Sequence, residues 1–288
     1  MRLGIHLYTF GSLEKAALRA AEIGAETFQI FSSSPRMWRA SILDQVQVRR
    51  LQDVRQSHAI HPLVIHVSYL INLASVDPEI HAKSVAAFRG ELERAEAIGA
   101  EYVVIHPGSY RGATPDQGIC NFVDGLYKAS AGLDSGKVKV LLENTAGAGS
   151  HLGSRFEELR DIRDLAAPLT DLPIGYCLDT CHLFAAGFDI RTAAGLRKTL
   201  LQAEELLGLD NVHLIHINDS VAAFNSHVDR HARLGEGQIG AAPFRRILAH
   251  AKLRDKVFIS ETPVDEPGGE LRNMDTLKSL ARTKSLVR

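Results

Sequence analysis

Eight short apolar runs, separated by amphipathic segments, constrain the fold of this chain more than any other feature. The runs are Leu3 to Leu7, Thr27 to Phe31, Leu63 to Val67, Tyr102 to His106, Val138 to Glu143, Ile174 to Asp179, Val212 to Ile217 and Val257 to Glu261. Strands that are buried on both faces read as apolar runs, and their alternation with helices is typical of a parallel sheet with right-handed crossovers. Eight such units predict a closed (β/α)₈ barrel, the TIM barrel of the α/β class.

A repeated sequence before two of these runs supports the same architecture. Residues 19–26 read Arg-Ala-Ala-Glu-Ile-Gly-Ala-Glu, and residues 94–101 read Arg-Ala-Glu-Ala-Ile-Gly-Ala-Glu. In each copy a glycine, Gly24 or Gly99, stands where the end of a helix favours left-handed backbone. Apolar residues at helical spacing after Ser12 predict the first helix, with Ser12 as its N-cap.

Length and composition restrict the class of protein. At 288 residues the chain could form two domains, but a single α/β barrel also has about this length, and we expect one domain. Neither a secretory signal pattern nor an apolar stretch of about 18 residues is present, so we expect a cytoplasmic protein without a membrane partner. The formal net charge of −1 gives no overall attraction to nucleic acid, so a polyanion would have to be attracted locally.

The three cysteines do not form a recognisable framework. Cys120, Cys177 and Cys181 are odd in number and lack Cys-x-x-Cys spacing. This pattern argues against a disulfide scaffold and against a thiolate zinc finger. We expect reduced and mostly buried thiols.

Six of the apolar runs have a metal-competent residue at or next to their end, namely His66, His106, Glu143, Asp179, His216 and Glu261. Such a residue contributes little to packing, but it can point a lone pair into the cleft at the carboxyl-terminal rim of a barrel. One histidine at a strand end is more often an ordinary hydrogen-bonded residue, and we interpret the other histidines in this way: His6, His58, His61, His81, His151, His213, His227 and His250. Six strand ends together predict a polynuclear metal centre.

Two compact motifs extend this set of ligands. Asp179-Thr-Cys-His182 adds His182, and Asp229-Arg-His231 places two ligands on the same side of an extended segment. Nine imidazole and carboxylate ligands without sulfur suit zinc, with manganese or iron as alternatives. Three divalent ions would carry six positive charges and the four ligand carboxylates four negative charges. The site would therefore have a net charge of about +2, enough to attract phosphate. Asp179 and Glu143 could instead pair with arginines, but this alternative leaves the histidines unexplained.

At these positions the chain resembles the endonuclease IV type of apurinic/apyrimidinic (AP) endonuclease, over nearly its whole length. The matching blocks occur in order and are His66-Val-Ser-Tyr-Leu-Ile-Asn72, His106-Pro-Gly108, Leu142-Glu-Asn-Thr-Ala-Gly147, Leu178-Asp-Thr-Cys-His182, His216-Ile-Asn-Asp-Ser220, Val228-Asp-Arg-His231 with Gly235-Glu-Gly237, and Glu261-Thr-Pro263. The resemblance implies a single TIM-barrel domain over residues 1–288 with three metal ions, usually zinc. Glu143 would bridge two ions, with His66 and His106 completing the first site. Asp179, His216 and Glu261 would complete the second, and His182, Asp229 and His231 the third.

The resemblance also implies an activity and a substrate. The family hydrolyses the phosphodiester bond on the 5′ side of abasic sites in double-stranded DNA with a metal-activated hydroxide, leaving a 3′ hydroxyl. A 3′ phosphodiesterase activity is implied as well. Glu143 and Glu261 would be catalytic. The protein would act in the cytoplasm, at the nucleoid, without an obligate protein partner.

Three further residues are implied in DNA binding. Arg36, Tyr69 and Leu70 would lie in loops that enter the duplex at the lesion; without the resemblance, Tyr69 and Leu70 would be read as a cap on the barrel and Arg36 as a solvated side chain. The chain departs from the family at Leu7-Tyr8-Thr9-Phe10-Gly11, at Val67 and at Val221, where a lysine is frequent. None of these departures replaces a ligand.

Two other functions compete with this interpretation. A metal-dependent sugar isomerase or epimerase of the xylose isomerase type shares the barrel, but has no use for His182, Asp229 and His231. A non-catalytic protein that binds damaged DNA would not need every ligand. The complete third set of ligands therefore favours the endonuclease.

Overall fold

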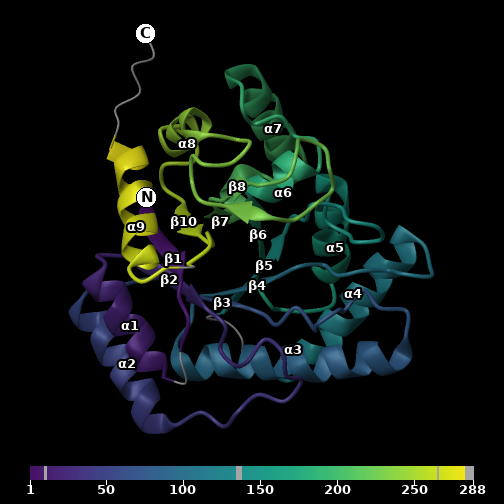
Figure 1. Ribbon diagram of the computed structural model, residues 1–288. Coiled ribbons are helices and arrows are strands. Elements are labelled where there is room, and N and C mark those ends of the chain that lie inside the picture. Colours follow the sequence, from purple (N-terminus) through teal and green to yellow (C-terminus); the bar gives the residue numbers. More distant parts are fainter. Residues whose placement is uncertain (10–11, 134–137, 265, 283–288) are drawn as a thin grey trace.

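Parallel strands close into a barrel at the centre of the molecule, and helices surround them (Figure 1). The computed structural model describes residues 1–9, 12–133, 138–264 and 266–282. The barrel strands are β1 (Arg2–His6), β2 (Thr27–Ile30), β3 (Leu63–His66), β4 (Tyr102–Ile105), β5 (Lys139–Glu143), β6 (Ile174–Asp179), β7 (Val212–His216) and β10 (Val257–Ser260). The predicted (β/α)₈ barrel is confirmed, and each predicted run matches its strand to within one residue at either end.

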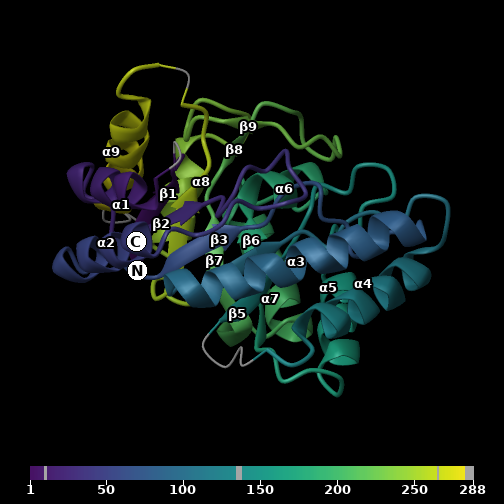
Figure 2. The same cartoon turned by 90° about the horizontal axis from the view of Figure 1, so that it is seen from below.

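Helices connect successive strands on the outside of the barrel. They are α1 (Leu13–Glu22), α2 (Gln45–Ser57), α3 (Pro78–Ile98), α4 (Pro115–Ser130), α5 (Phe156–Ala166), α6 (Thr180–Ala185), α7 (Ala193–Leu206), the 3₁₀ turn η1 (Leu209–Asn211), α8 (Ala241–Leu248) and α9 (Gly269–Arg282). Figure 2 shows α3 and α4 lying side by side along one flank. Over the described residues, no helix is both long and apolar enough to cross a membrane.

The predicted helix ends agree with the structure. The Ser12 side chain accepts the backbone N–H of Lys15 and caps α1, as expected. Gly24 and Gly99 have φ angles of +66° and +72°, the left-handed conformation for which glycine carries no steric penalty. Each helix therefore stops at a defined residue, after which the chain turns into the next strand.

The order of strands around the barrel is β1-β10-β7-β6-β5-β4-β3-β2, and every neighbouring pair is parallel. All carboxyl ends of these strands consequently meet at one rim. A separate antiparallel ribbon is formed by β8 (Asp219–Ser220) and β9 (His231–Ala232). The ribbon follows β7, so it brings the segment around residue 230 back to this rim.

Apolar side chains fill the barrel interior, so the barrel is a packed core and not a pore. The interior layer consists of Val64, Val104, Leu141, Cys177, Leu214, Val257 and Ile259. A larger apolar layer lies between the strands and the surrounding helices. Above the interior layer, toward the carboxyl ends, the buried side chains become ionisable: Glu143, Asp179 and His216 have no exposed surface. Buried charges are costly unless they are paired or bind ions, so this rim is the candidate site.

Candidate metal centre

The rim brings together all nine side chains that the sequence predicts as ligands. His66, Glu143, Asp179 and His216 are the last residues of β3, β5, β6 and β7. His106 and Glu261 directly follow β4 and β10, His182 lies on the short helix α6, and Asp229 and His231 lie at β9. The strand ends, the ribbon and α6 thus converge from distant parts of the chain.

Among the described residues, five groups of potential ligand atoms lie within 4.8 Å of one another, and three of these groups contain only imidazole and carboxylate. These three groups are His66, His106 and Glu143; Glu143, Asp179, His216 and Glu261; and His182, Asp229 and His231. These groups coincide with the three sets of ligands implied by the family resemblance. Only Glu143 belongs to two of them.

Glu143 lies between two of the ligand groups, because its two carboxylate oxygens face different partners. Oε2 lies 3.3 Å from His66 Nε2 and 3.2 Å from His106 Nε2, whereas Oε1 lies 2.8 Å from His216 Nδ1. Burial alone would raise the pKa of this carboxyl, but His216 and His106 outweigh it and hold the pKa well below its usual range. The side chain is therefore an ionised carboxylate with both oxygens directed at ligand atoms.

The third group is more open to solvent. Oδ2 of Asp229 lies 3.1 Å from His182 Nε2, and Oδ1 lies 3.3 Å from His231 Nε2. Burial would lower the pKa of His231, but Asp229 and Asp179 raise it to about 9. The Asp229 side chain is 48% exposed, so an incoming substrate can reach this side of the centre.

The donor set fits divalent metal ions. Imidazole nitrogen and carboxylate oxygen are ligands of zinc, and of manganese or iron. Cys177 and Cys181 also lie near ligand atoms, but burial raises the pKa of both thiols to about 12. The thiolate is the metal-binding form of cysteine, so the nitrogen and oxygen groups are the better sites.

Three of the imidazoles are held by backbone carbonyls. Nδ1 of His66 donates to the Val67 carbonyl at 2.8 Å, and Nδ1 of His182 donates to the Asn144 carbonyl at 2.8 Å. Nδ1 of His231 faces the Glu261 carbonyl at 3.4 Å. Because a carbonyl can only accept, Nδ1 carries a proton in each ring, so Nε2 is the nitrogen that a metal ion could bind in place of a proton, as is common for histidine ligands.

Two asparagines position the acidic residues, Asn144 through the backbone of Asp179 and Asn218 through carboxylates, and neither was predicted from the sequence. Asn144 Oδ1 accepts the backbone N–H of Asp179 at 2.7 Å. The Asn218 amide donates to Asp179 Oδ2 at 2.5 Å and to Glu261 Oε2 at 3.2 Å. Asn144 follows Glu143 directly and Asn218 lies two residues after His216. An amide residue next to a strand-end ligand was the signal that could have identified both.

His6 was grouped with the ordinary histidines, yet the structure places it against the centre. It is the last residue of β1, and its Nδ1 lies 3.9 Å from Glu261 Oε1. It is outside the three ligand groups, and its Nδ1 is hydrogen-bonded to Gln29. The hydrogen-bonded interpretation of His6 holds, but its position at a strand end belongs to the same pattern as the ligands.

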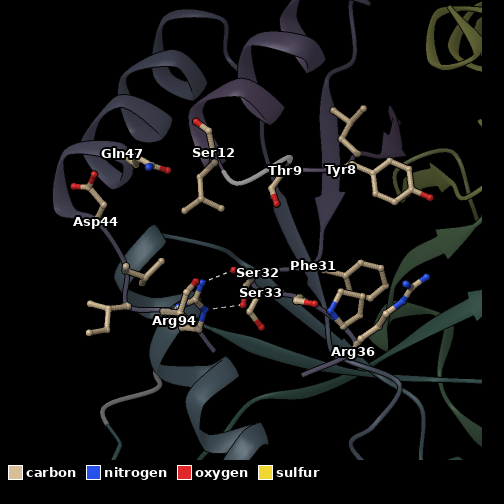
Figure 3. A pocket seen from close by; sticks show the side chains of 17 residues that line it. Tyr8, Thr9, Ser12, Phe31, Ser32, Ser33, Arg36, Asp44, Gln47 and Arg94 are labelled. Carbon is tan, nitrogen blue, oxygen red and sulfur yellow. Dashed lines mark hydrogen bonds between the residues drawn. The ribbon is translucent and has the colours of Figure 1, made fainter. Parts of the chain in front are cut away.

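One cavity opens onto the cluster, and a larger one, whose lining contains none of the nine candidate ligands, lies farther along the loops. The first, of about 320 Å³, is lined by His66, Tyr69, Asn72, His106, His182 and Asp229. The other, of about 600 Å³, lies between the segments that follow β1 and β2 (Figure 3). Its floor is ordered by Arg94, whose Nε donates to Ser32 Oγ at 2.9 Å. The rim therefore has room for an extended ligand beyond the metal groups.

Two of the three predicted DNA-contact residues, Arg36 and Tyr69, line these cavities. Tyr69 is 69% exposed, and its ring lies 5.5 Å from that of Phe31 and 5.6 Å from that of His66. Leu70 is half-buried beside it. Arg36 is exposed and lies next to Phe31 at the edge of the larger cavity (Figure 3). Of the departures from the family, Val221 is exposed, and Phe10 and Gly11 lie outside the described residues.

Comparison with known proteins identifies the family. The family model described as "Xylose isomerase-like TIM barrel" matches residues 17–284. The chain is 67% identical over 284 residues to a "Probable endonuclease 4" of Solibacter usitatus, covering 99% of this chain and 98% of the relative. A probable endonuclease 4 of Halothermothrix orenii is 42% identical over 91% of this chain and 94% of its own length.

Solved structures agree with these relatives. The crystal structure of endonuclease IV from Thermus thermophilus superposes with a TM-score of 0.85 at 37% identity, covering 97% of this chain and 98% of that chain. A D-tagatose 3-epimerase-like protein has a TM-score of 0.69 at 20% identity, with 97% of each chain covered, and that likeness extends to the fold alone. The chain therefore belongs to the endonuclease IV family of metal-dependent AP endonucleases.

Proposed function

We propose that the protein hydrolyses the phosphodiester bond on the 5′ side of abasic sites in duplex DNA, leaving a 3′ hydroxyl. It would also remove 3′ blocking groups as a phosphodiesterase. Residues 1–288 would act as a single domain in the cytoplasm, at the nucleoid, without an obligate protein partner. The observation that carries the proposal is that three ligand groups meet at one rim, with Glu143 common to two of them.

Each ligand group would hold one divalent ion. We propose zinc, with manganese or iron as alternatives, because the ligands are imidazoles and carboxylates. When bound, such ions lower the pKa of a coordinated water toward 7 and offset the negative charge of a phosphate. Four ligand carboxylates against six metal charges leave about two positive charges in a protein whose formal net charge is −1. This local surplus would attract the DNA backbone.

Glu143 and Glu261 have different roles in this arrangement. Burial would raise the pKa of Glu261, but His216 and His66 outweigh it and lower the pKa to about 2. Glu143 is ionised for the same reason. Glu261 would thus serve as a fixed carboxylate ligand. Glu143, whose two oxygens face two groups, would orient the attacking water between them.

Recognition would depend on the missing base. An abasic nucleotide is cheaper to turn out of a duplex because its own stacking and pairing are already lost. The cavity of about 320 Å³ beside His106 and Asp229 would receive the exposed sugar phosphate. Tyr69 and Leu70 would fill the gap left in the helix, and Arg36 would enter the duplex beside them. The exposure of Tyr69 and Arg36 at this rim supports that role.

Incision of a defined abasic duplex tests the proposal. Glu261→Gln and His231→Ala should lower the rate of incision by at least about 100-fold, because each alters one metal site. His58→Ala, an exposed histidine at the end of α2, is the matched control and should cut at the wild-type rate. Full incision by both site variants would contradict the proposal. An undamaged duplex should remain uncut.

Metal analysis provides the second test. Purified protein should contain about three divalent ions per chain, and removal by a chelator should abolish incision and lower the melting temperature. The stability falls because an ion that binds only the folded state stabilises that state. A content of one ion, or an active metal-free protein, would overturn the trinuclear assignment.

A further inference from the structure

The imidazole of His216 is held differently from three other imidazoles of the centre. His66, His182 and His231 each direct Nδ1 at a backbone carbonyl. His216 is turned the other way: its Nδ1 faces Glu143 and Glu261, and its Nε2 lies 2.8 Å from Oε1 of Gln29. The tautomer of His216 therefore depends on a side chain, which a substitution can remove.

Gln29 is an unusual residue for its position. It lies in the middle of β2, between Phe28 and Ile30, and has no exposed surface. It belongs to none of the three ligand groups. A buried amide in an otherwise apolar strand is costly unless its donors and acceptor are satisfied, so its contacts account for its presence.

The contacts of Gln29 fix the orientation of its amide. Nε2 donates to Glu261 Oε1 at 2.6 Å and to His6 Nδ1 at 3.0 Å, while Oε1 accepts from His216 Nε2. An ionised Glu261 can only accept, so the amide nitrogen must face it. The second hydrogen on Nε2 points to His6 Nδ1, a ring nitrogen that can accept it. Reversing the amide would place its oxygen against a carboxylate oxygen.

We propose that Gln29 is a positioning residue of the metal centre. Its carbonyl oxygen selects the tautomer of His216 in which Nδ1 is the metal ligand, and its amide nitrogen holds Glu261 in the same ligand group. Gln29 thus does for His216 what backbone carbonyls do for His66, His182 and His231. The inference rests on the metal centre of the proposed function and adds a residue outside its ligand set.

Gln29→Met and Gln29→Glu separate the two contacts. Methionine has a similar length and shape but offers neither the acceptor nor the donor. Glutamate keeps an oxygen for His216 Nε2 and loses the donor to Glu261. The control is Thr27→Val on the same strand, since Thr27 is equally buried and its hydroxyl donates to the Pro62 carbonyl at 2.6 Å, at the amino-terminal end of β2.

Metal affinity and the ¹⁵N shifts of the His216 ring are the readouts, with zinc as the probe. In zinc-loaded wild type and Thr27→Val we expect a metal-bound Nδ1 and a protonated Nε2. In Gln29→Met we expect a 10- to 100-fold loss of affinity for one zinc ion in chelator competition, the size typical of lost contacts behind a ligand, and loss of that ring signature. Gln29→Glu should retain the ring signature.

The outcomes distinguish the inference from the proposed function. If wild type binds three zinc ions and Gln29→Met matches it in affinity and ring signature, the positioning role is refuted and the metal centre stands. If Gln29→Met does not fold, loss of the ring signature in Gln29→Glu refutes the role in its place. If wild type binds no zinc, both the centre and the inference fail.

Discussion

The backbone N–H of Gly237 donates to Oδ2 of Asp219 at 3.0 Å, in a position where no side chain would fit. A Cβ atom on Gly237 would lie 2.5 Å from Oδ1 of the same carboxylate. Asp219 is fully buried and accepts four further backbone N–H groups, from Ser220, Gly235, Ile239 and Gly240. One carboxylate thus shapes the segment that follows His231, one of the proposed ligands.

Replacement of Asp219 by asparagine should disrupt this segment. The amide is uncharged and has a single oxygen, so all five N–H groups lose a charged acceptor and those that face the new NH2 group lose any acceptor, at a cost of about 2–4 kcal/mol of stability. Urea denaturation measures the loss, and chelator competition should show weaker metal binding as His231 becomes less fixed. Asp210→Asn, at an exposed carboxylate, should change stability by less than about 0.5 kcal/mol. Equal stability of the two variants would contradict the role of Asp219.

Gly4 and Gly90 should respond oppositely to substitution by alanine. A Cβ on Gly4 would lie 2.0 Å from the Thr27 carbonyl oxygen on the neighbouring strand β2, so Gly4→Ala must separate β1 from β2. Gly90 lies within α3 and a Cβ there meets nothing within 4 Å. We expect Gly4→Ala to lower the free energy of unfolding by more than about 3 kcal/mol. Gly90→Ala should raise it by about 0.5–1 kcal/mol, because alanine has a higher helix propensity than glycine. Urea denaturation of both variants would show opposite shifts of the midpoint, and shifts of the same sign would exclude this explanation.

The barrel and the residues that meet at its rim could be predicted from the sequence because both are encoded locally. Each strand is a short apolar run, and His66, Glu143 and His216 end such runs. Closing parallel strands into a barrel then brings their ends to one rim whatever their separation along the chain. The grouping into three sets came from the family resemblance, and the geometry reproduces those sets.

The supporting contacts could not be predicted because they depend on the relative positions of distant strands. Gln29 and His216 are 187 residues apart and meet only because β2 and β7 point side chains into the same barrel. Asp219 accepts four of its five N–H groups from residues 235–240, an irregular segment that follows β9. No periodicity in the sequence marks such contacts. A buried polar residue such as Gln29 within an apolar run was the one available hint.

Stability should depend on pH through His213, at the opposite end of the barrel from the metal centre. Burial and the Lys139 ammonium, whose Nζ lies 2.8 Å from His213 Nε2, lower the pKa of this imidazole to about 4. The fold favours the neutral ring, so the stabilisation is complete above the unfolded pKa of about 6.5 and is lost as the pH falls toward 4. Between pH 7 and pH 5 the free energy of unfolding of wild type should fall by about 1 kcal/mol more than that of His213→Gln. This figure is reduced for partial solvent screening. Urea denaturation of both proteins at the two pH values checks this, and parallel losses would contradict it.

Tyr69 should contribute to DNA binding without affecting the metal ions. Its ring is exposed but is held between Phe31 and His66, so it is ordered before DNA arrives. A pre-ordered aromatic ring that replaces a missing base gains stacking of about 1–3 kcal/mol, so Tyr69→Ala should raise the Kd for an abasic duplex by about 10- to 100-fold. Binding is best measured in the Glu261→Gln background, where the substrate stays intact, with Tyr127→Ala on α4 as the control for loss of an exposed tyrosine. The zinc content of Tyr69→Ala should match the parent protein, because the side chain belongs to no ligand group. If Tyr69→Ala binds the abasic duplex as tightly as the parent protein, the ring does not stack on DNA. Tyr69 would then only cap the barrel, the role that requires no contact with DNA.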